Sequence, residues 1–100
     1  VAKRLGMPEE IQFRYRSTYF NHIFSSDGYA AGYYTYLWAQ VLDCDGFEVF
    51  EKNGVFDPAT AARLKKVLES GNDADPMTLY EGFAGHRPTA DALLRDKGLK

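Results

Sequence analysis

Residues 22–38 read His-Ile-Phe-Ser-Ser-Asp-Gly-Tyr-Ala-Ala-Gly-Tyr-Tyr-Thr-Tyr-Leu-Trp, and the interpretation of the whole chain depends on this stretch. A polar loop, residues 25–28, separates its histidine from a run of tyrosines. Tyr29, Tyr33 and Tyr36 recur at the spacing of one helical face, so the pattern predicts three phenols within a sector of about 60° on one helix. The opposite face of that helix would carry Tyr34, Leu37, Trp38 and Val41.

Two interpretations of this row of phenols are open at this point. In the first, the rings pack against a neighbouring element and their hydroxyls reach water, as in most aromatic stripes. In the second, the phenols face a cleft and the polar loop brings His22 close to them. Phenol O–H groups can stabilise negative charge that develops on a substrate oxygen. The spacing alone does not separate the two interpretations.

The composition limits the classes of function. The chain has 100 residues, enough for one small domain or for part of a larger one. Its net charge is -2 and its basic residues are scattered, so we expect no nucleic-acid partner, which would need a basic stripe. No apolar run approaches the ~20 residues that cross a bilayer, so we expect no membrane partner. The single cysteine is compatible with a reducing compartment, and we expect a cytoplasmic protein. Because the sequence starts at Val1 and lacks an initiator methionine, we expect an excised or processed segment.

Turn and capping signals predict an all-α fold. Residues 11–24 alternate aromatic with polar side chains, which favours an extended or irregular aromatic arm before the first long helix. That helix should run from about Ala30 to Lys52 and end at Asn53-Gly54, with a possible bend at Gly46.

Three shorter helices are expected after the long one. The first two carry the same start signal, an aspartate as N-cap followed by proline at the first helical position. Their start signals are Asp57-Pro58, Asp75-Pro76 and Thr89, and their ends lie near Ser70, Gly85 and Gly98.

The segment lacks the patterns of a metal site or a nucleophile. His22 and His86 are the only histidines, and neither a His-Glu-x-x-His nor a Cys-x-x-Cys pattern occurs, so we expect no metal ligands in this segment. His86 lies in a Gly-His-Arg-Pro loop and is expected to be a solvated surface histidine. Cys44 stands between Asp43 and Asp45, whose charges would raise the thiol pKa and oppose a reactive thiolate.

Residues 20–24, Phe-Asn-His-Ile-Phe, and residues 28–38, Gly-Tyr-Ala-Ala-Gly-Tyr-Tyr-Thr-Tyr-Leu-Trp, resemble the C-terminal portion of the M3 family of zinc metallopeptidases. This family includes thimet oligopeptidase, oligopeptidase A and peptidyl-dipeptidase. Later segments also fit in order, among them residues 41–47, 53–57 and 85–88. The resemblance identifies residues 1–100 as the C-terminal segment of an M3-type catalytic domain, without a complete zinc site. It implies one piece of a larger, mostly helical clamshell peptidase.

The resemblance also implies roles for five residues. Tyr29 and Tyr36 would be catalytic and stabilise the oxyanion. His22 and Tyr33 would bind and position the substrate, and Gly28 would belong to a flexible loop that closes over the peptide. The implied cofactor is Zn2+, whose ligands, a His-Glu-x-x-His helix and a later glutamate, would lie before this segment. The parent chain would then be a zinc metallopeptidase that hydrolyses short oligopeptides, and the isolated segment is expected to be inactive.

The loop before the first tyrosine departs from the family pattern. The family usually has a Gly-Gly pair where this chain has Asp27-Gly28, and the loop is one residue longer. The expected partners are an oligopeptide substrate and the remainder of the catalytic chain. An alternative is a free-standing helical interaction module without catalysis, because exposed aromatic surface would look similar in both. A small-ligand carrier built around the phenols is a third idea, which no specific feature supports.

Overall fold

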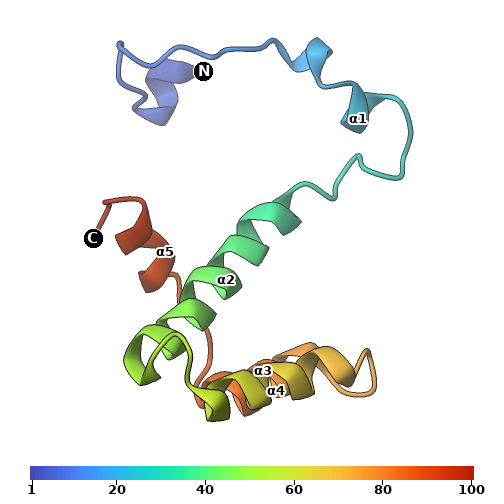
Figure 1. Cartoon of the computed structure of the whole chain (residues 1–100). Helices are drawn as coiled ribbons and strands as arrows, with labels where there is room; N and C mark the ends of the chain where they lie inside the picture. The colour runs from blue at the N-terminus through green and yellow to red at the C-terminus, as the bar shows by residue number, and fades with distance from the viewer. The chain divides into compact units, whose positions relative to one another are not determined.

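The computed structural model describes every residue from Val1 to Lys100 and contains helices and turns but no strand (Figure 1). This confirms the predicted all-α class. The chain divides into two compact units, residues 1–34 and residues 35–100. The elements are η1 (Ala2–Leu5), η2 (Ser17–Tyr19), α1 (Asn21–Phe24), α2 (Tyr34–Asn53), α3 (Pro58–Glu69), α4 (Pro76–Ala84) and α5 (Asp91–Asp96).

The aromatic arm in the first unit is irregular rather than a strand. Residues 12–16 contain no helix, and the two short elements η2 and α1 follow them. Without a partner strand, the backbone N–H and C=O groups of this segment form hydrogen bonds with residues close in sequence. The amide of Tyr19 donates a hydrogen bond to the carbonyl of Arg16 at 2.9 Å, and the amide of Ser25 donates one to the carbonyl of Asn21 at 2.8 Å. Of the two interpretations of this segment, the irregular one is therefore confirmed.

The long helix α2 begins at Tyr34 rather than at about Ala30. The residues before it form tight turns, in which the amide of Gly32 donates to the carbonyl of Tyr29 at 3.3 Å. A glycine in a helix costs ~1 kcal/mol relative to alanine, which favours turns over an early helix start here. Tyr29 and Tyr33 thus precede the helix. The prediction that three phenols share one helical face is wrong.

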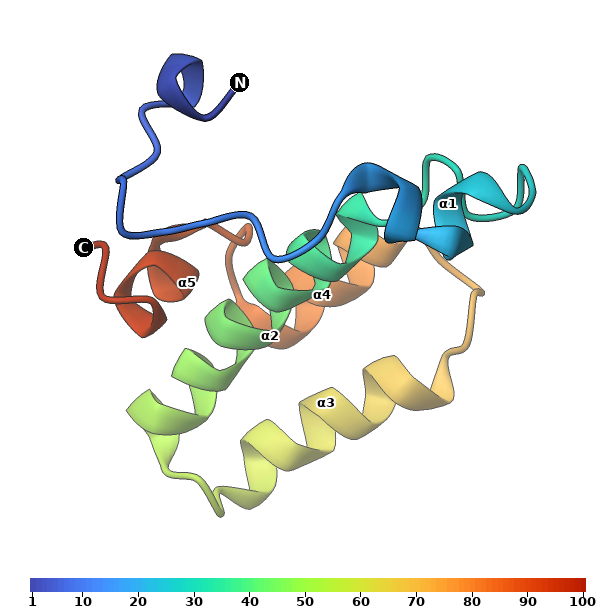
Figure 2. The ribbon, with the colours of Figure 1, turned by 90° about the horizontal axis from the view of Figure 1, so that it is seen from above.

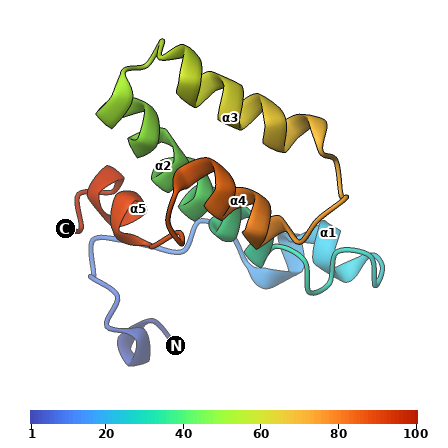
Figure 3. The same cartoon turned by 90° about the horizontal axis from the view of Figure 1, so that it is seen from below.

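The second unit consists of α2 from Thr35 onward, α3, α4 and α5. In both turned views the chain reverses sharply between α2 and α3, and α4 passes close to α2 (Figures 2 and 3). Helices α3 and α4 pack against each other. The buried apolar core of the chain is small and comprises Val49, Phe83, Ala92 and Leu93. None of the helices combines the length and the apolarity that crossing a bilayer requires.

The two aspartate-proline signals begin helices where predicted. The Asp57 carboxylate accepts the amide of Thr60 at 2.7 Å at the start of α3, and the Asp75 carboxylate accepts that of Thr78 at 3.0 Å at the start of α4. The last helix has Ala90 rather than the predicted Thr89 at its N-cap position, although the Thr89 hydroxyl accepts the amide of Asp91, the first residue of the helix, at 3.4 Å.

We expect Asp57→Ala to lower the free energy of unfolding by about 1 kcal/mol, because the amide of Thr60 loses its acceptor. The hydrogen bonds to Thr60 also hold the pKa of the Asp57 carboxyl below its usual value, as expected for a carboxylate that is charged in the folded state. Urea unfolding monitored by circular dichroism measures the change. Asp57→Asn is the control, since asparagine is an equally good cap. A loss of similar size in both variants would contradict the capping role.

A polar network ties together three helices of the second unit. Thr60 is fully buried, and its hydroxyl oxygen accepts from Asn53 of α2 and from Arg63 of α3, both at 3.1 Å. The guanidinium of Arg63 also donates to the carbonyl of Phe83 in α4 at 3.1 Å. The end of α2, the start of α3 and the end of α4 are therefore joined around one threonine.

Gly46 lies in an unbroken stretch of α2, so this glycine does not end the helix. A Cβ atom at this position would lie 3.4 Å from Cε1 of Phe83 and 3.7 Å from the hydroxyl of Tyr80. The missing side chain therefore lets two aromatic rings of α4 approach the backbone of α2 closely.

Enlarging Gly46 to leucine is expected to lower the free energy of unfolding by about 1 to 3 kcal/mol, because the added atoms would overlap these rings. The matched control is Gly82→Ala in α4, where an added Cβ meets nothing within 4 Å. This control should stabilise the helix by up to ~1 kcal/mol. Urea unfolding of both variants tests the close approach, and an unchanged Gly46→Leu protein would refute it.

Candidate active-site residues

Four aromatic side chains gather in the first unit, and we name them the aromatic cluster: Phe20, His22, Tyr29 and Tyr33. The ring of Tyr33 is the centre of the cluster. Its centroid lies 4.6 Å from that of Phe20, 6.2 Å from that of His22 and 6.4 Å from that of Tyr29. All three pairs meet edge to face, the arrangement that the charge distribution of aromatic rings favours.

Local turns build this cluster. His22 lies in the single turn of α1, and the turns that follow bring Tyr33 back to the histidine and place Tyr29 against Tyr33. The imidazole is exposed, Tyr29 is 61% exposed, and Tyr33 is half-buried. Three of the five predicted site residues therefore lie together, with an imidazole and a phenol open to a ligand.

The remaining two predicted site residues are Tyr36 and Gly28. Tyr36 is 67% exposed in the first turn of α2 and belongs to the second unit. Gly28 lies in an exposed turn, where an added Cβ would meet only the hydroxyl of Ser26, at 3.6 Å. That is an ordinary van der Waals distance, so sterics in this turn do not require glycine.

Phe20 is the cluster member that the sequence reasoning missed. It packs on Tyr33 more closely than either of the two predicted residues in contact with that ring. The available signal was its place in Phe-Asn-His-Ile-Phe, two residues before the histidine. The ring centroids of Phe20 and His22 lie 6.3 Å apart.

A buried carboxylate in the second unit forms another polar site, which we name the Asp45 site. Asp45 in α2 is only 4% exposed. Its Oδ2 atom accepts the hydroxyl of Tyr80 at 2.5 Å and lies 2.9 Å from Nε2 of His86, and its Oδ1 atom accepts the amide of Thr89 at 3.2 Å. His86 is an exposed surface histidine, as predicted, with a side chain that is 43% exposed, but its ring also contacts a buried carboxylate, which the local sequence did not predict.

The Asp45 site is electrostatically set for a charged aspartate and a neutral tyrosine. Burial raises the pKa of the Asp45 carboxyl, but hydrogen bonds from Tyr80, the amide of Thr89 and His86 outweigh burial and hold that pKa below its usual value. Burial and the hydrogen bond to Asp45 raise the pKa of Tyr80. Such a pair holds helices together and is not prepared to transfer a proton at neutral pH.

Because the pKa of Asp45 is lowered in the folded state, its contribution to stability is present above the pKa of an unfolded aspartate and is lost as pH falls through the lowered value. We expect the free energy of unfolding to decrease on acidification below about pH 4. Urea unfolding over a pH series measures this slope. Asp45→Asn should flatten it, and an identical slope in the variant would assign the acid sensitivity to other carboxyls.

Cys44 does not have the surroundings of a nucleophile. Partial burial raises the pKa of its thiol, and the charges of Asp96 and Asp43 raise it further. This confirms the direction predicted from the acidic neighbours in the sequence. The structure also contains no group of three or more histidine, cysteine, aspartate or glutamate side chains placed to hold a metal ion.

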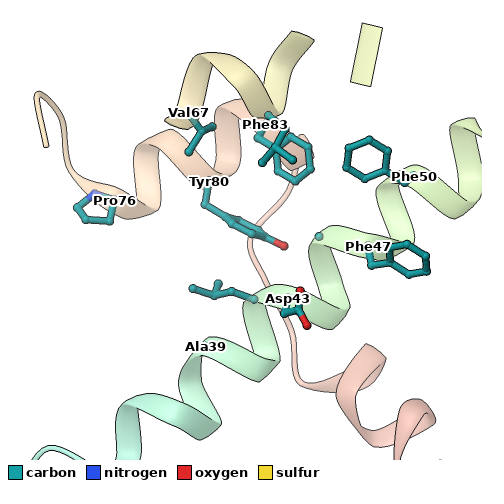
Figure 4. Close-up of a pocket in the computed structure, with 11 residues that line it drawn as sticks. Ala39, Asp43, Phe47, Phe50, Val67, Pro76, Tyr80 and Phe83 are labelled. Carbon is teal, nitrogen blue, oxygen red and sulfur yellow. The ribbon is translucent and has the colours of Figure 1, made fainter. Parts of the chain in front are cut away.

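An apolar groove of about 580 Å³ runs between α2, α3 and α4 in the second unit (Figure 4). Phe50 and Phe83 lie across from each other, and Tyr80 projects from α4 toward α2. None of the five predicted site residues lines this groove. Its lining comprises Ala39, Leu42, Asp43, Gly46, Phe47, Phe50, Leu64, Val67, Pro76, Tyr80 and Phe83.

The family model and the similar proteins found by comparison all indicate the same family for this chain. The family model described as Peptidase family M3 matches residues 1–99. Oligopeptidase A of Haemophilus influenzae is 49% identical over 81 residues, which cover 80% of this chain and 12% of that protein. Dipeptidyl carboxypeptidase of Salmonella typhimurium is 43% identical over 100 residues, which cover 99% of this chain and 14% of that protein. A probable cytosolic oligopeptidase A of Arabidopsis thaliana is 41% identical over 85 residues, covering 80% of this chain and 12% of that protein. This chain therefore spans 12% to 14% of the length of these relatives.

Proposed function

This chain belongs to peptidase family M3, and from that membership we propose that it supplies substrate-binding and oxyanion-stabilising residues to a parent zinc peptidase that hydrolyses short oligopeptides. The observation that carries the proposal is the aromatic cluster, in which His22 and Tyr29 are both open to a ligand and Tyr33 joins them. Two relatives are named for peptidase activity, one as an oligopeptidase and one as a dipeptidyl carboxypeptidase.

In this proposal each residue of the segment has a distinct task. When water attacks a peptide carbonyl, negative charge accumulates on the carbonyl oxygen. The phenols of Tyr36 and Tyr29 donate hydrogen bonds to that oxygen. These hydrogen bonds strengthen as the charge grows, so they stabilise the transition state more than the ground state and lower the barrier. His22 holds the substrate backbone by hydrogen bonding, and Tyr33 orients the histidine and the peptide through its ring contacts.

The residues of this segment do not form a metal site. Zinc and its ligands therefore belong, in this proposal, to parts of the parent chain outside residues 1–100. The remainder of the catalytic chain is then the obligatory partner of the segment, the substrate is an oligopeptide, and the location is the cytoplasm.

The loop that carries Gly28 also carries a charge that bears on specificity. Asp27 directly precedes the glycine and is exposed. Its carboxylate would repel the C-terminal carboxylate of a peptide bound nearby. In this proposal, the charge of Asp27 favours substrates whose C-terminus lies away from this loop.

Activity of the parent polypeptide tests the proposal. We expect purified parent protein to hydrolyse a fluorogenic oligopeptide, to lose that activity on dialysis against a chelator, and to regain it with zinc. The isolated segment, residues 1–100, should be inactive under all three conditions. Hydrolysis by the isolated segment, or chelator-resistant hydrolysis by the parent, would contradict the proposal.

A further inference from the structure

A pocket with aromatic walls and one charged residue lies beside the aromatic cluster in the first unit. Its lining comprises Tyr15, Arg16, Tyr19 and Phe20, all of which are exposed, and we name it the Arg16 pocket. Its volume is about 510 Å³, within the range of about 300 to 1,000 Å³ that is typical of small-molecule sites. Its walls suit an apolar side chain, and its guanidinium suits an anion.

One short turn builds the Arg16 pocket. The backbone of Arg16 is extended, with φ −81° and ψ 151°, and the helix η2 follows it. The amide of Tyr19 donates a hydrogen bond to the carbonyl of Arg16 at 2.9 Å, and the amide of Phe20 donates one to the carbonyl of Ser17 at 3.0 Å. This turn brings Tyr19 and Phe20 back toward Tyr15 and Arg16, so that the four side chains line one cavity.

The guanidinium of Arg16 makes no hydrogen bond and no ion pair within the segment. The arginines of the second unit differ, because Arg63, Arg87 and Arg95 each bind a carbonyl or a carboxylate. The sequence from residue 11 to residue 24 contains two arginines and no acidic residue, so no neighbouring carboxylate competes for Arg16. A guanidinium presents its N–H groups in a planar fork that matches the two oxygens of a carboxylate. The pocket therefore holds a carboxylate-binding group that is not used within the segment.

Phe20 belongs both to the Arg16 pocket and to the aromatic cluster. Its ring centroid lies 4.6 Å from that of Tyr33, whose centroid lies 6.4 Å from that of Tyr29. An extended peptide advances about 3.3 to 3.6 Å per residue, so about three residues cover the distance from Tyr29 to Phe20. A peptide held at the cluster therefore reaches the Arg16 pocket with a residue close to the one that Tyr29 contacts.

We propose that the Arg16 pocket binds the C-terminal residue of the peptide substrate, with Arg16 on its carboxylate and the aromatic walls around its side chain. This inference rests on the proposed function and specifies its substrates as peptides with a free C-terminus. A C-terminal residue carries a carboxylate and a side chain on the same carbon, and the pocket offers a guanidinium and apolar walls side by side. An acidic side chain supplies the carboxylate but leaves the aromatic walls without a partner.

The charges of the first unit favour the same orientation of the peptide. Asp27, in the exposed loop before Tyr29, repels a carboxylate, whereas Arg16 attracts one. Both side chains belong to the unit that contains the aromatic cluster. The C-terminus of the substrate is therefore directed to the Arg16 pocket and away from the loop.

Calorimetric titration of the parent polypeptide with acetyl-alanyl-phenylalanine, as the free acid and as its C-terminal amide, tests the pocket. The free acid should bind about tenfold to 100-fold more tightly, because hydrogen bonds to a charged carboxylate are stronger than those to a neutral amide. Arg16→Ala should weaken binding of the free acid to the level of the amide. Arg14→Ala, which removes the nearby arginine that does not line the pocket, should keep the difference. Should Arg16→Ala fail to fold, Arg16→Gln keeps a long polar side chain without the charge, and it too should lose the preference.

Three results would overturn this inference. The first is wild-type protein that binds the acid and the amide equally or does not bind the acid. The second is a preference for the acid that persists without the charge of Arg16. The third is an acetyl-alanyl-glutamic acid whose C-terminus is amidated binding as tightly as the free acid, which would assign the pocket to acidic side chains. The titration measures binding alone, so a parent polypeptide that hydrolyses no peptide would refute the proposed function while leaving this result readable.

Discussion

Replacing Tyr36 with phenylalanine in the parent polypeptide is expected to lower kcat by about 100-fold to 1000-fold, with little change in KM. The substitution removes one hydroxyl and keeps the ring, so packing around this exposed side chain is preserved. A donor aimed at a developing oxyanion contributes mainly in the transition state, and its loss lowers kcat and kcat/KM together.

Tyr34→Phe is the matched control for this experiment. Tyr34 lies in the same first turn of α2 and is similarly exposed, at 73% against 67% for Tyr36. It has no role in the proposed chemistry, so its kinetics should equal those of the wild type. Unchanged kcat in Tyr36→Phe would assign that residue to packing, and a rise in KM alone would assign it to ground-state binding.

Asp45→Ala is expected to lower the free energy of unfolding by about 3 to 5 kcal/mol. The substitution removes the acceptor of the Tyr80 hydroxyl, the His86 ring and the Thr89 amide together, so three partly buried contacts are lost at once. Urea unfolding of the parent polypeptide, compared with wild type at neutral pH, measures the loss.

The control for the Asp45 substitution is Asp43→Ala, two residues earlier in the same helix. Asp43 is exposed, so its removal should change the free energy of unfolding by less than about 0.5 kcal/mol. Losses of equal size in the two variants would mean that helix charge, rather than the buried hydrogen bonds, accounts for the effect.

Elements specified by neighbouring residues were predictable from the sequence. Asp57 and Asp75 each accept a backbone amide three residues later, so the start of α3 and that of α4 are encoded within one turn. The end of α2 was predictable for the same reason. It is followed by Gly54, whose φ of 108° is a backbone conformation that favours glycine. Such signals need no knowledge of distant parts of the chain.

The start of α2 was predicted wrongly because two local preferences competed. The tyrosine spacing favoured a helix from about Ala30, but Gly32 favours turns, and the structure has turns up to Tyr33. Periodicity describes where side chains would point if a helix formed. It does not establish that the backbone prefers a helix at that point.

The Asp45 site could not be predicted because its members are far apart in sequence. Tyr80, His86 and Thr89 lie 35, 41 and 44 positions from Asp45. Each of these residues looks ordinary in its own neighbourhood, and only the packing of α4 and its following loop on α2 brings them together. By contrast, the contact of His22 with Tyr33 spans one loop, and the resemblance to the M3 family named both residues.

The most direct test of the central claim is a crystal structure of the parent polypeptide with a phosphinic peptide, whose tetrahedral phosphorus and charged oxygen imitate the intermediate of peptide hydrolysis. Our account predicts the phenol oxygens of Tyr36 and Tyr29 within about 3 Å of that oxygen, with His22 bonded to the peptide backbone. Phenol oxygens more than about 4 Å away, beyond hydrogen-bonding distance, would contradict the assignment of these tyrosines to the oxyanion.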